Sequence, residues 1–151
     1  MTVTRYPPLY RSGVRSFNDR DFFASHEHWE DLWRDTHGQL RDFYKGLIQA
    51  AVTLYHFTNG NLRGARKLYE TSGRYLRPYQ PCCEGLDVTK FLADMADCCA
   101  ELIASADAGG RVILDPAKIP TIVLESPPAG IPTVSAEADC NVPADRAQER
   151  P

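Results

Sequence analysis

The chain has 151 residues, 43% hydrophobic and 25% charged, which is enough for one globular domain with a hydrophobic core. A net charge of −3 disfavours nucleic acid as a partner, because phosphate binding favours a basic surface. The sequence lacks both the apolar run of roughly 20 residues that spans a bilayer and an N-terminal secretory signal, so we expect a cytoplasmic protein that does not bind membranes.

An irregular N-terminal arm is expected over residues 1–16, where Pro7 and Pro8 interrupt regular structure. Asn18 can then cap the first helix, because its side chain can accept a backbone N–H of the first turn. We expect this helix to end just before Gly38, since glycine commonly follows the last turn of a helix.

Three further helices are expected from apolar residues that recur at helical spacing. Their approximate ranges are 39–58, 62–77 and 88–106. Asn61 and Asp87 can cap the last two. Because the links between the helices are short, the sequence predicts an all-α fold, an antiparallel bundle of about four helices over residues 17–107.

The last part of the chain differs in composition from the predicted bundle. Residues 108–125 contain the β-branched runs "RVILDP" and "IPTIVLE", which predict extended segments that dock on the bundle. Residues 126–151 are rich in proline, alanine and charge, which predicts a disordered C-terminal tail. The cysteines at 82, 83, 98 and 99 form adjacent pairs that suit one zinc ion poorly, so they are expected to be small core residues with free thiols.

The stretch "DFFASHEHWEDLW", residues 21–33, places polar side chains among aromatic ones. On a helical wheel His26 and Glu30 fall inside the apolar arc that runs from Trp29 through Trp33 to Phe23. Burying a carboxylate without a partner is costly, so a partner for Glu30 is expected from His26 and from another helix.

The second predicted helix offers such partners, because Gln49 and His56 are seven residues apart and share one face. The sequence therefore predicts a polar cluster between the first two predicted helices. Its members are His26, Glu27, Glu30, Trp33, Gln49 and His56. Three interpretations remain open: a hydrogen-bonded network, a ligand pocket, or a divalent metal ion held by His26, Glu30 and His56.

A second candidate site lies at the start of the third predicted helix. Asn61 and the N–H groups of the following turn, with Arg63 and Arg66 nearby, could bind a small anion such as phosphate or a carboxylate. The alternative is that these arginines belong to solvated faces and surface salt bridges.

Two long stretches contain these residues, "FNDRDFFASHEHWEDLWR" and "FYKGLIQAAVTLYHFTNGNLRGARKLYE", and they are followed by "LRPY" and "GLDVTKFL". Over about residues 16–105 these motifs resemble a known family, domain of unknown function 309. The chain departs from the family pattern at Ala24, where glutamate is usual, and at Asp19-Arg20, where glycine is common. The resemblance implies an all-α fold of a few helices and brings no established activity. Matching positions are Phe17, Asn18, Phe22, Phe23, His26, Glu27, Glu30, Trp33, Gly46, Leu47, Ile48, Gln49, His56, Gly60, Asn61, Gly64 and Ala65.

The leading functional hypothesis is a structural or interaction module that uses the polar cluster to fix helix packing. The alternative is a metal- or small-anion-binding protein or a hydrolase-like enzyme, in which Glu30 or Glu27 acts as ligand or general base. The sequence shows no phosphate-binding loop and no dinucleotide motif. Central helices with two packing faces and exposed tryptophan edges are compatible with a homodimer.

Overall fold

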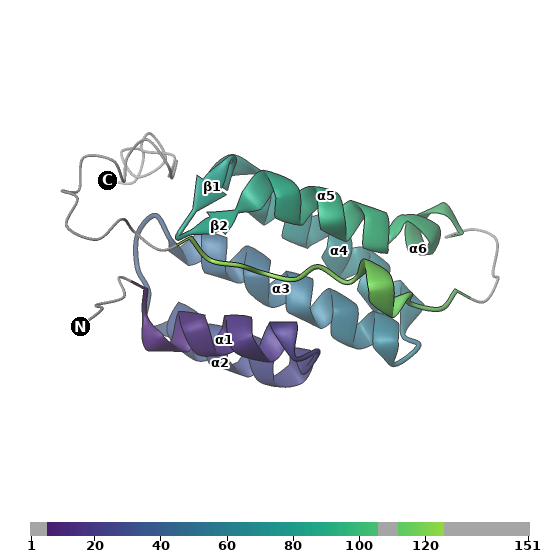
Figure 1. The fold of residues 1–151 in the computed structure, drawn as a ribbon, viewed down its shortest axis with the longest axis horizontal. Coiled ribbons are helices and arrows are strands. Elements are labelled where there is room, and N and C mark those ends of the chain that lie inside the picture. Colours follow the sequence, from purple (N-terminus) through teal and green to yellow (C-terminus); the bar gives the residue numbers. More distant parts are fainter. Residues whose placement is uncertain (1–5, 106–111, 126–151) are drawn as a thin grey trace.

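A computed structural model describes residues 6–105 and 112–125, and the fold of this part is all-α apart from one short hairpin (Figure 1). The helices are α1 (Pro8–Asn18), α2 (Phe22–Arg34), α3 (Arg41–Thr58), α4 (Leu62–Leu76), α5 (Val88–Cys98) and α6 (Ala100–Ala104), with 3-10 turns η1 (Arg77–Tyr79) and η2 (Pro116–Lys118). Strands β1 (Cys82–Cys83) and β2 (Leu86–Asp87) pair antiparallel. Within the described ranges no helix is both long and apolar enough to cross a membrane. The all-α class is thus confirmed, but these ranges hold six α-helices rather than about four.

Helix α1 corrects the prediction of an irregular N-terminal arm. Pro8 stands at the start of the helix, where its missing N–H costs no hydrogen bond and its fixed φ suits the helical backbone. Tyr10, Val14 and Phe17 recur at helical spacing and are buried. Proline therefore begins this helix, where the sequence analysis expected it to interrupt regular structure.

The cap predicted for α2, the first helix expected from the sequence, is also wrong. Asn18 is the last residue of α1, and Asp21 caps α2 by accepting the N–H of Ala24 at 3.1 Å. Arg20 lies between the two helices with a φ of 67°. Glycine adopts this left-handed backbone without strain, as would the glycine that the family resemblance implies at this position.

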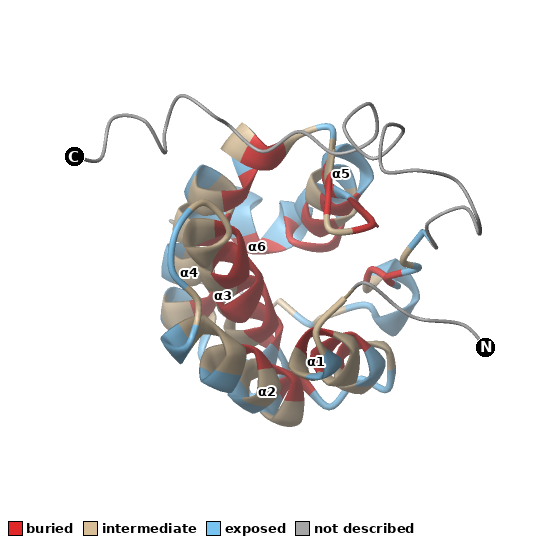
Figure 2. Cartoon of the chain, turned by 90° about the vertical axis from the view of Figure 1, so that its left-hand side faces the viewer, coloured by how far each residue is buried: buried red, intermediate tan, exposed pale blue. Residues whose placement is uncertain are grey.

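Helix α3 lies between α2 and α4 and packs against both (Figure 2). Its buried residues face the interior, toward α1 and α5. The predicted caps of the next helices are confirmed: Asn61 accepts the N–H of Gly64, and Asp87 accepts the N–H of Lys90. The last predicted helix is divided at Cys99 into α5 and α6.

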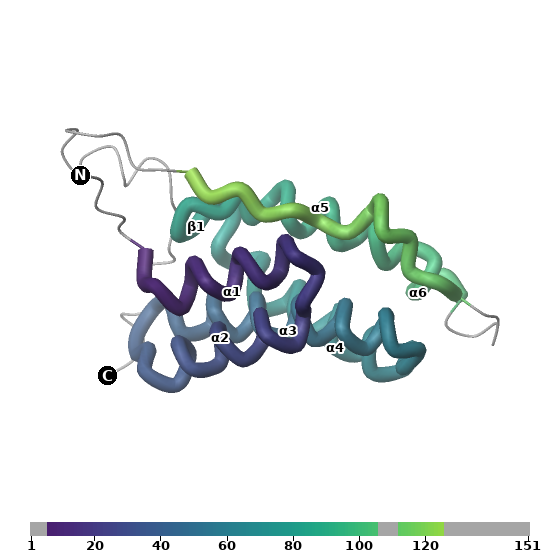
Figure 3. The backbone as a smooth tube through the Cα atoms, turned by 60° about the horizontal axis from the view of Figure 1, so that its bottom comes forward, coloured from purple at the N-terminus to yellow at the C-terminus, as the bar shows by residue number. Residues whose placement is uncertain are grey.

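Residues 112–125, which we call the strap, run alongside α1 and α5 (Figure 3). The side chain of Asn18 holds the strap at Ile122, donating to its carbonyl and accepting its N–H, each at 2.8 Å. The N–H of Glu125 donates to the carbonyl of Gly85. Ile122 is buried in the core, so the strap completes the hydrophobic interior. Residues 108–111 and the predicted tail lie outside the described residues.

Replacing Asn18 with alanine is expected to free the strap. Both hydrogen bonds to Ile122 are lost, and two backbone groups lose their partners, at a cost of about 2 kcal/mol. Trypsin should then cut faster after Lys118, because cleavage there requires local opening of the strap. The matched control is Asn59→Ala, at the exposed C-terminal end of α3. Equal cleavage rates in the two variants would contradict the role given to Asn18.

Candidate functional site

Helix α2 is tied to α1 through side chains that the sequence analysis did not select. The indole N–H of Trp29 donates to the carbonyl of Tyr10 at 3.1 Å, and the hydroxyl of Ser25 donates to the carbonyl of Gly13 at 2.9 Å. Both donors are fully buried. Ser25 shares the helical stripe of Phe22 and Trp29, which is the signal that could have identified it.

His26 and Glu30 lie on another edge of α2, and the contacts of Glu30 are made within its own helix. The Nε2 atom of His26 is 3.3 Å from Oε1 of Glu30, and the guanidinium of Arg34 is 3.8 Å from the same oxygen. The side chains of His26 and Glu30 are 24% and 36% exposed. The two residues are therefore paired, but Glu30 is not withdrawn from solvent as the sequence analysis expected.

Both ring nitrogens of His26 face oxygen atoms. Nδ1 lies 3.3 Å from the carbonyl oxygen of Phe23, and Nε2 faces the carboxylate of Glu30. A carbonyl and an ionised carboxylate only accept hydrogen bonds, so a ring protonated on both nitrogens can donate to both. A metal ion at Nε2 would have to replace the contact with Glu30 or share it.

The polar side chains of α3 do not join this pair. Nδ1 of His56 lies 3.4 Å from the amide nitrogen of Asn61, at the turn into α4. The Oε1 atom of Gln49 is buried without a hydrogen-bond partner among the described residues, and Glu27 is exposed. The predicted cluster is thus divided between α2 and the α3–α4 turn.

The predicted metal ligands His26, Glu30 and His56 are not brought together. In residues 6–105 and 112–125, no group of three or more histidine, cysteine, aspartate or glutamate side chains is arranged to hold a metal ion. His26 and Glu30 supply two such side chains, and His56 contacts Asn61 instead.

A series of aromatic contacts across α2 and α3 connects the two parts of the predicted cluster, His26 on α2 and His56 at the α3–α4 turn. The ring of Phe23 lies 5.5 Å from that of His26 and 5.6 Å from that of Tyr55, which lies 6.0 Å from the ring of His56. Phe23 and Tyr55 are 49% and 38% exposed. We call Phe23, His26, Tyr55 and His56 the ring patch; it is an exposed aromatic surface flanked by two imidazoles.

Trp33, also predicted to belong to the cluster, is covered by two cations. The guanidinium carbon of Arg41 is 4.0 Å from the centroid of its ring, and Nζ of Lys45 is 4.4 Å from it. Such contacts stabilise a positive charge over an aromatic face. Trp33 therefore holds two α3 side chains against α2.

The predicted anion site at the start of α4 is only partly assembled. The side-chain oxygen of Asn61 is occupied as the helix cap. Arg66 donates to the carbonyl of Leu102 in α6, at 3.4 Å, and Arg63 is exposed. Of the two predicted arginines, only Arg63 would therefore be available to an anion at this helix end.

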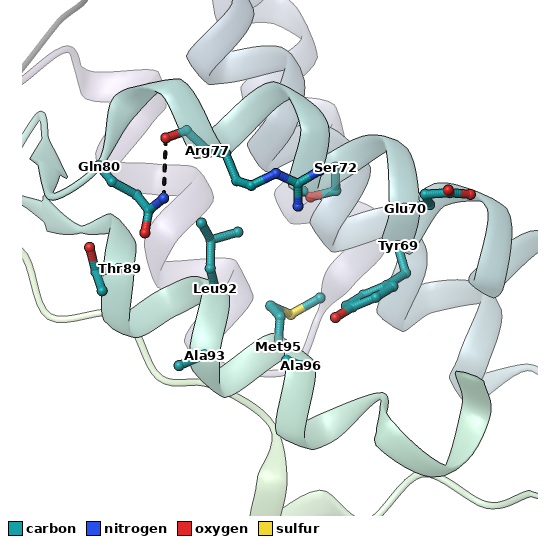
Figure 4. A pocket seen from close by; sticks show the side chains of 11 residues that line it. Tyr69, Glu70, Ser72, Arg77, Gln80, Thr89, Leu92, Ala93, Met95 and Ala96 are labelled. Carbon is teal, nitrogen blue, oxygen red and sulfur yellow. Dashed lines mark hydrogen bonds between the residues drawn. The ribbon is translucent and has the colours of Figure 1, made fainter. Parts of the chain in front are cut away.

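A pocket of about 600 Å³ lies between α4 and α5 and was missed by the sequence analysis (Figure 4). Small residues on the facing helices, Gly73, Ala93 and Ala96, are the sequence signal that could have indicated it. Partial burial raises the pKa of Tyr69 in its wall, and the positive charge of Arg77 opposes part of that rise. The full lining is Tyr69, Glu70, Ser72, Gly73, Arg77, Gln80, Thr89, Leu92, Ala93, Met95 and Ala96.

Comparison with known proteins finds one family that matches part of this chain. The sequence model described as "Domain of unknown function (DUF309)" matches residues 10–68. Residues 10–68 of the chain are therefore similar to the DUF309 family. The matched residues run from α1 into α4 and include the ring patch, whereas the pocket between α4 and α5 lies beyond them.

Two relatives of this chain are uncharacterised proteins. YpuF of Bacillus subtilis (strain 168) is 33% identical over 113 residues, which cover 72% of this chain and 64% of YpuF. A protein of Aquifex aeolicus (strain VF5) is 32% identical over 60 residues, covering 39% of this chain and 18% of that protein. The matches thus span less than two thirds of either relative.

Proposed function

We propose that this chain is a non-catalytic interaction module that binds a protein partner through the ring patch. The observation that carries the proposal is the exposed contact between Phe23 and Tyr55 across α2 and α3. Aromatic side chains remove a large apolar area from water when a partner covers them. They also contribute much of the binding energy at many protein interfaces.

The energetics of α2 support this proposal. Its attachment to α1 uses the buried groups of Ser25 and Trp29, which lie away from the ring patch. The pair formed by His26 and Glu30 is partly exposed and local to one helix, so it contributes little to stability. Substitutions in the ring patch can therefore weaken binding while leaving the fold intact.

The charges around the ring patch favour a folded protein surface as partner. Glu30 adds a carboxylate beside His26, and the exposed guanidinium of Arg34 adds a positive charge 3.8 Å from that carboxylate. Aromatic rings with charges of both signs around them are typical of protein interfaces.

Photo-cross-linking in the source organism tests the proposal. Benzoylphenylalanine replaces Phe23 in one variant and Tyr55 in another, and exposed Lys67 on α4 is the control position. We expect the same protein to be cross-linked from both ring-patch positions and not from Lys67. That protein is then purified, and its affinity for the intact chain is measured.

The double variant Phe23→Ser/Tyr55→Ser should bind the purified partner about tenfold more weakly or worse, with little change in melting temperature. A second copy of the chain as the cross-linked species would identify the module as self-associating. The proposal is wrong if the ring-patch positions cross-link nothing beyond the Lys67 control, or if the double variant keeps full affinity.

A further inference from the structure

We propose that the pocket between α4 and α5 binds a small organic carboxylate, with Arg77 holding the carboxylate and the facing apolar side chains holding its hydrocarbon body. The inference is independent of the ring patch, since no residue of that patch lines the pocket. It assigns a ligand class to a site beyond the DUF309 match.

The size and lining of the pocket suit a small molecule. Its volume of about 600 Å³ falls in the range of pockets that enclose ligands of this kind. Apart from Thr89, the wall from α5 is apolar, formed by Leu92, Met95 and the two alanines Ala93 and Ala96. Tyr69 extends its ring from α4 toward Met95, which closes the pocket on one side (Figure 4).

The cation that would bind the ligand is available. Arg77 forms no ion pair with any carboxylate of the residues that the structure describes. Its side chain runs back along α4 toward Ser72, so that the guanidinium lies at the pocket (Figure 4). A guanidinium can donate two parallel hydrogen bonds to one carboxylate, which favours this anion over an uncharged group.

Gly73 creates the space in which Arg77 lies. A Cβ at this position would lie 3.0 Å from Nη1 of Arg77, so a side chain here would make the guanidinium shift by a few tenths of an ångström. Polar side chains elsewhere in the lining can donate further hydrogen bonds to a ligand. The hydroxyls of Tyr69 and Thr89 belong to the lining, and burial keeps the phenol of Tyr69 protonated as a hydrogen-bond donor.

Glu70 lines the same pocket without opposing the carboxylate. It lies two turns before Arg77 on α4, and its carboxylate points away from the guanidinium (Figure 4). The positive charge therefore lies beside Gly73, about one turn before η1, and the apolar body of the ligand would extend along α5 toward Met95 and Ala96.

The full-length chain offers a specific reporter, because its two methionines are Met1 and Met95. Protein labelled with carbon-13 at the methionine methyl groups gives one signal from the pocket and one internal reference. The probes are naphthaleneacetate and its uncharged amide, naphthaleneacetamide, each titrated up to its solubility. We expect naphthaleneacetate to shift the Met95 signal saturably, and to bind about tenfold more tightly than the amide.

Three variants complete the experiment. Arg77→Met should remove the preference for the carboxylate, while Arg74→Met, an exposed arginine of α4 outside the pocket, should retain it. Ala96→Trp fills the pocket from an exposed position and should abolish binding of both probes. An unmoved Met95 signal, equal affinity for the two probes, or an unchanged preference in folded Arg77→Met would each overturn the proposal.

Discussion

Replacing Gly13 with alanine is expected to lower the free energy of unfolding by about 3 kcal/mol. A Cβ at this position would lie 2.1 Å from Nε1 of Trp29, where no atom fits. The indole is fully buried and cannot move aside without disturbing its hydrogen bond to the carbonyl of Tyr10. The gain in helix propensity, about 1 kcal/mol, is smaller than this cost. Denaturation by urea, followed by circular dichroism, measures the difference.

Gly73→Ala is the matched control, because Gly73 also lies inside a helix. There a Cβ would meet the end of the flexible Arg77 side chain at 3.0 Å, so the arginine can move away. We expect this variant to be as stable as the original chain or more stable by up to about 1 kcal/mol. If the two alanine variants lost equal stability, the close packing of α1 against Trp29 would be refuted.

The variant Phe17→Ala is expected to lose about 4 kcal/mol. Phe17 is fully buried, and its ring lies 5.2 Å from that of Phe22, 5.9 Å from that of Trp29 and 5.9 Å from that of Phe91. One side chain thus joins α1 to α2 and α5. Removing it leaves a cavity where three elements meet, and the surrounding rings can fill that cavity only in part.

Phe23→Ala provides the comparison, since it removes the same number of atoms from a ring that is half exposed. Its expected cost is below about 1 kcal/mol. The pair of variants also separates folding from binding, because Phe23 belongs to the ring patch and Phe17 does not. A loss at Phe23 as large as the loss at Phe17 would show that the ring patch supports the fold.

Helical periodicity predicted the position of α3 and α4 to within a few residues, and the capping residues Asn61 and Asp87 were readable because their hydrogen bonds are local. Helix α1 was missed even though Tyr10, Val14 and Phe17 carry its stripe. Proline favours the first turn of a helix but disrupts its interior. The prediction considered only the disruption.

The candidate site was harder to predict because a helical wheel treats one helix at a time. The apolar arc of α2 faces two neighbours: Trp29 packs on α1, whereas Phe23 reaches α3. His26 lies inside this arc, but a wheel does not show which part of the arc is covered by a neighbouring helix and which part is exposed to water. The pocket at Arg77 depends on the separation of α4 from α5, a long-range property that no local spacing encodes.

The strap can join the fold only late in the synthesis of the chain. Asn18 and Ile122 are 104 positions apart, so their hydrogen bonds close only after the ribosome has released most of the chain. Until then the apolar surface that Ile122 covers is in water. A partly synthesised chain would therefore present that surface to molecular chaperones, and arrival of the strap would end their access.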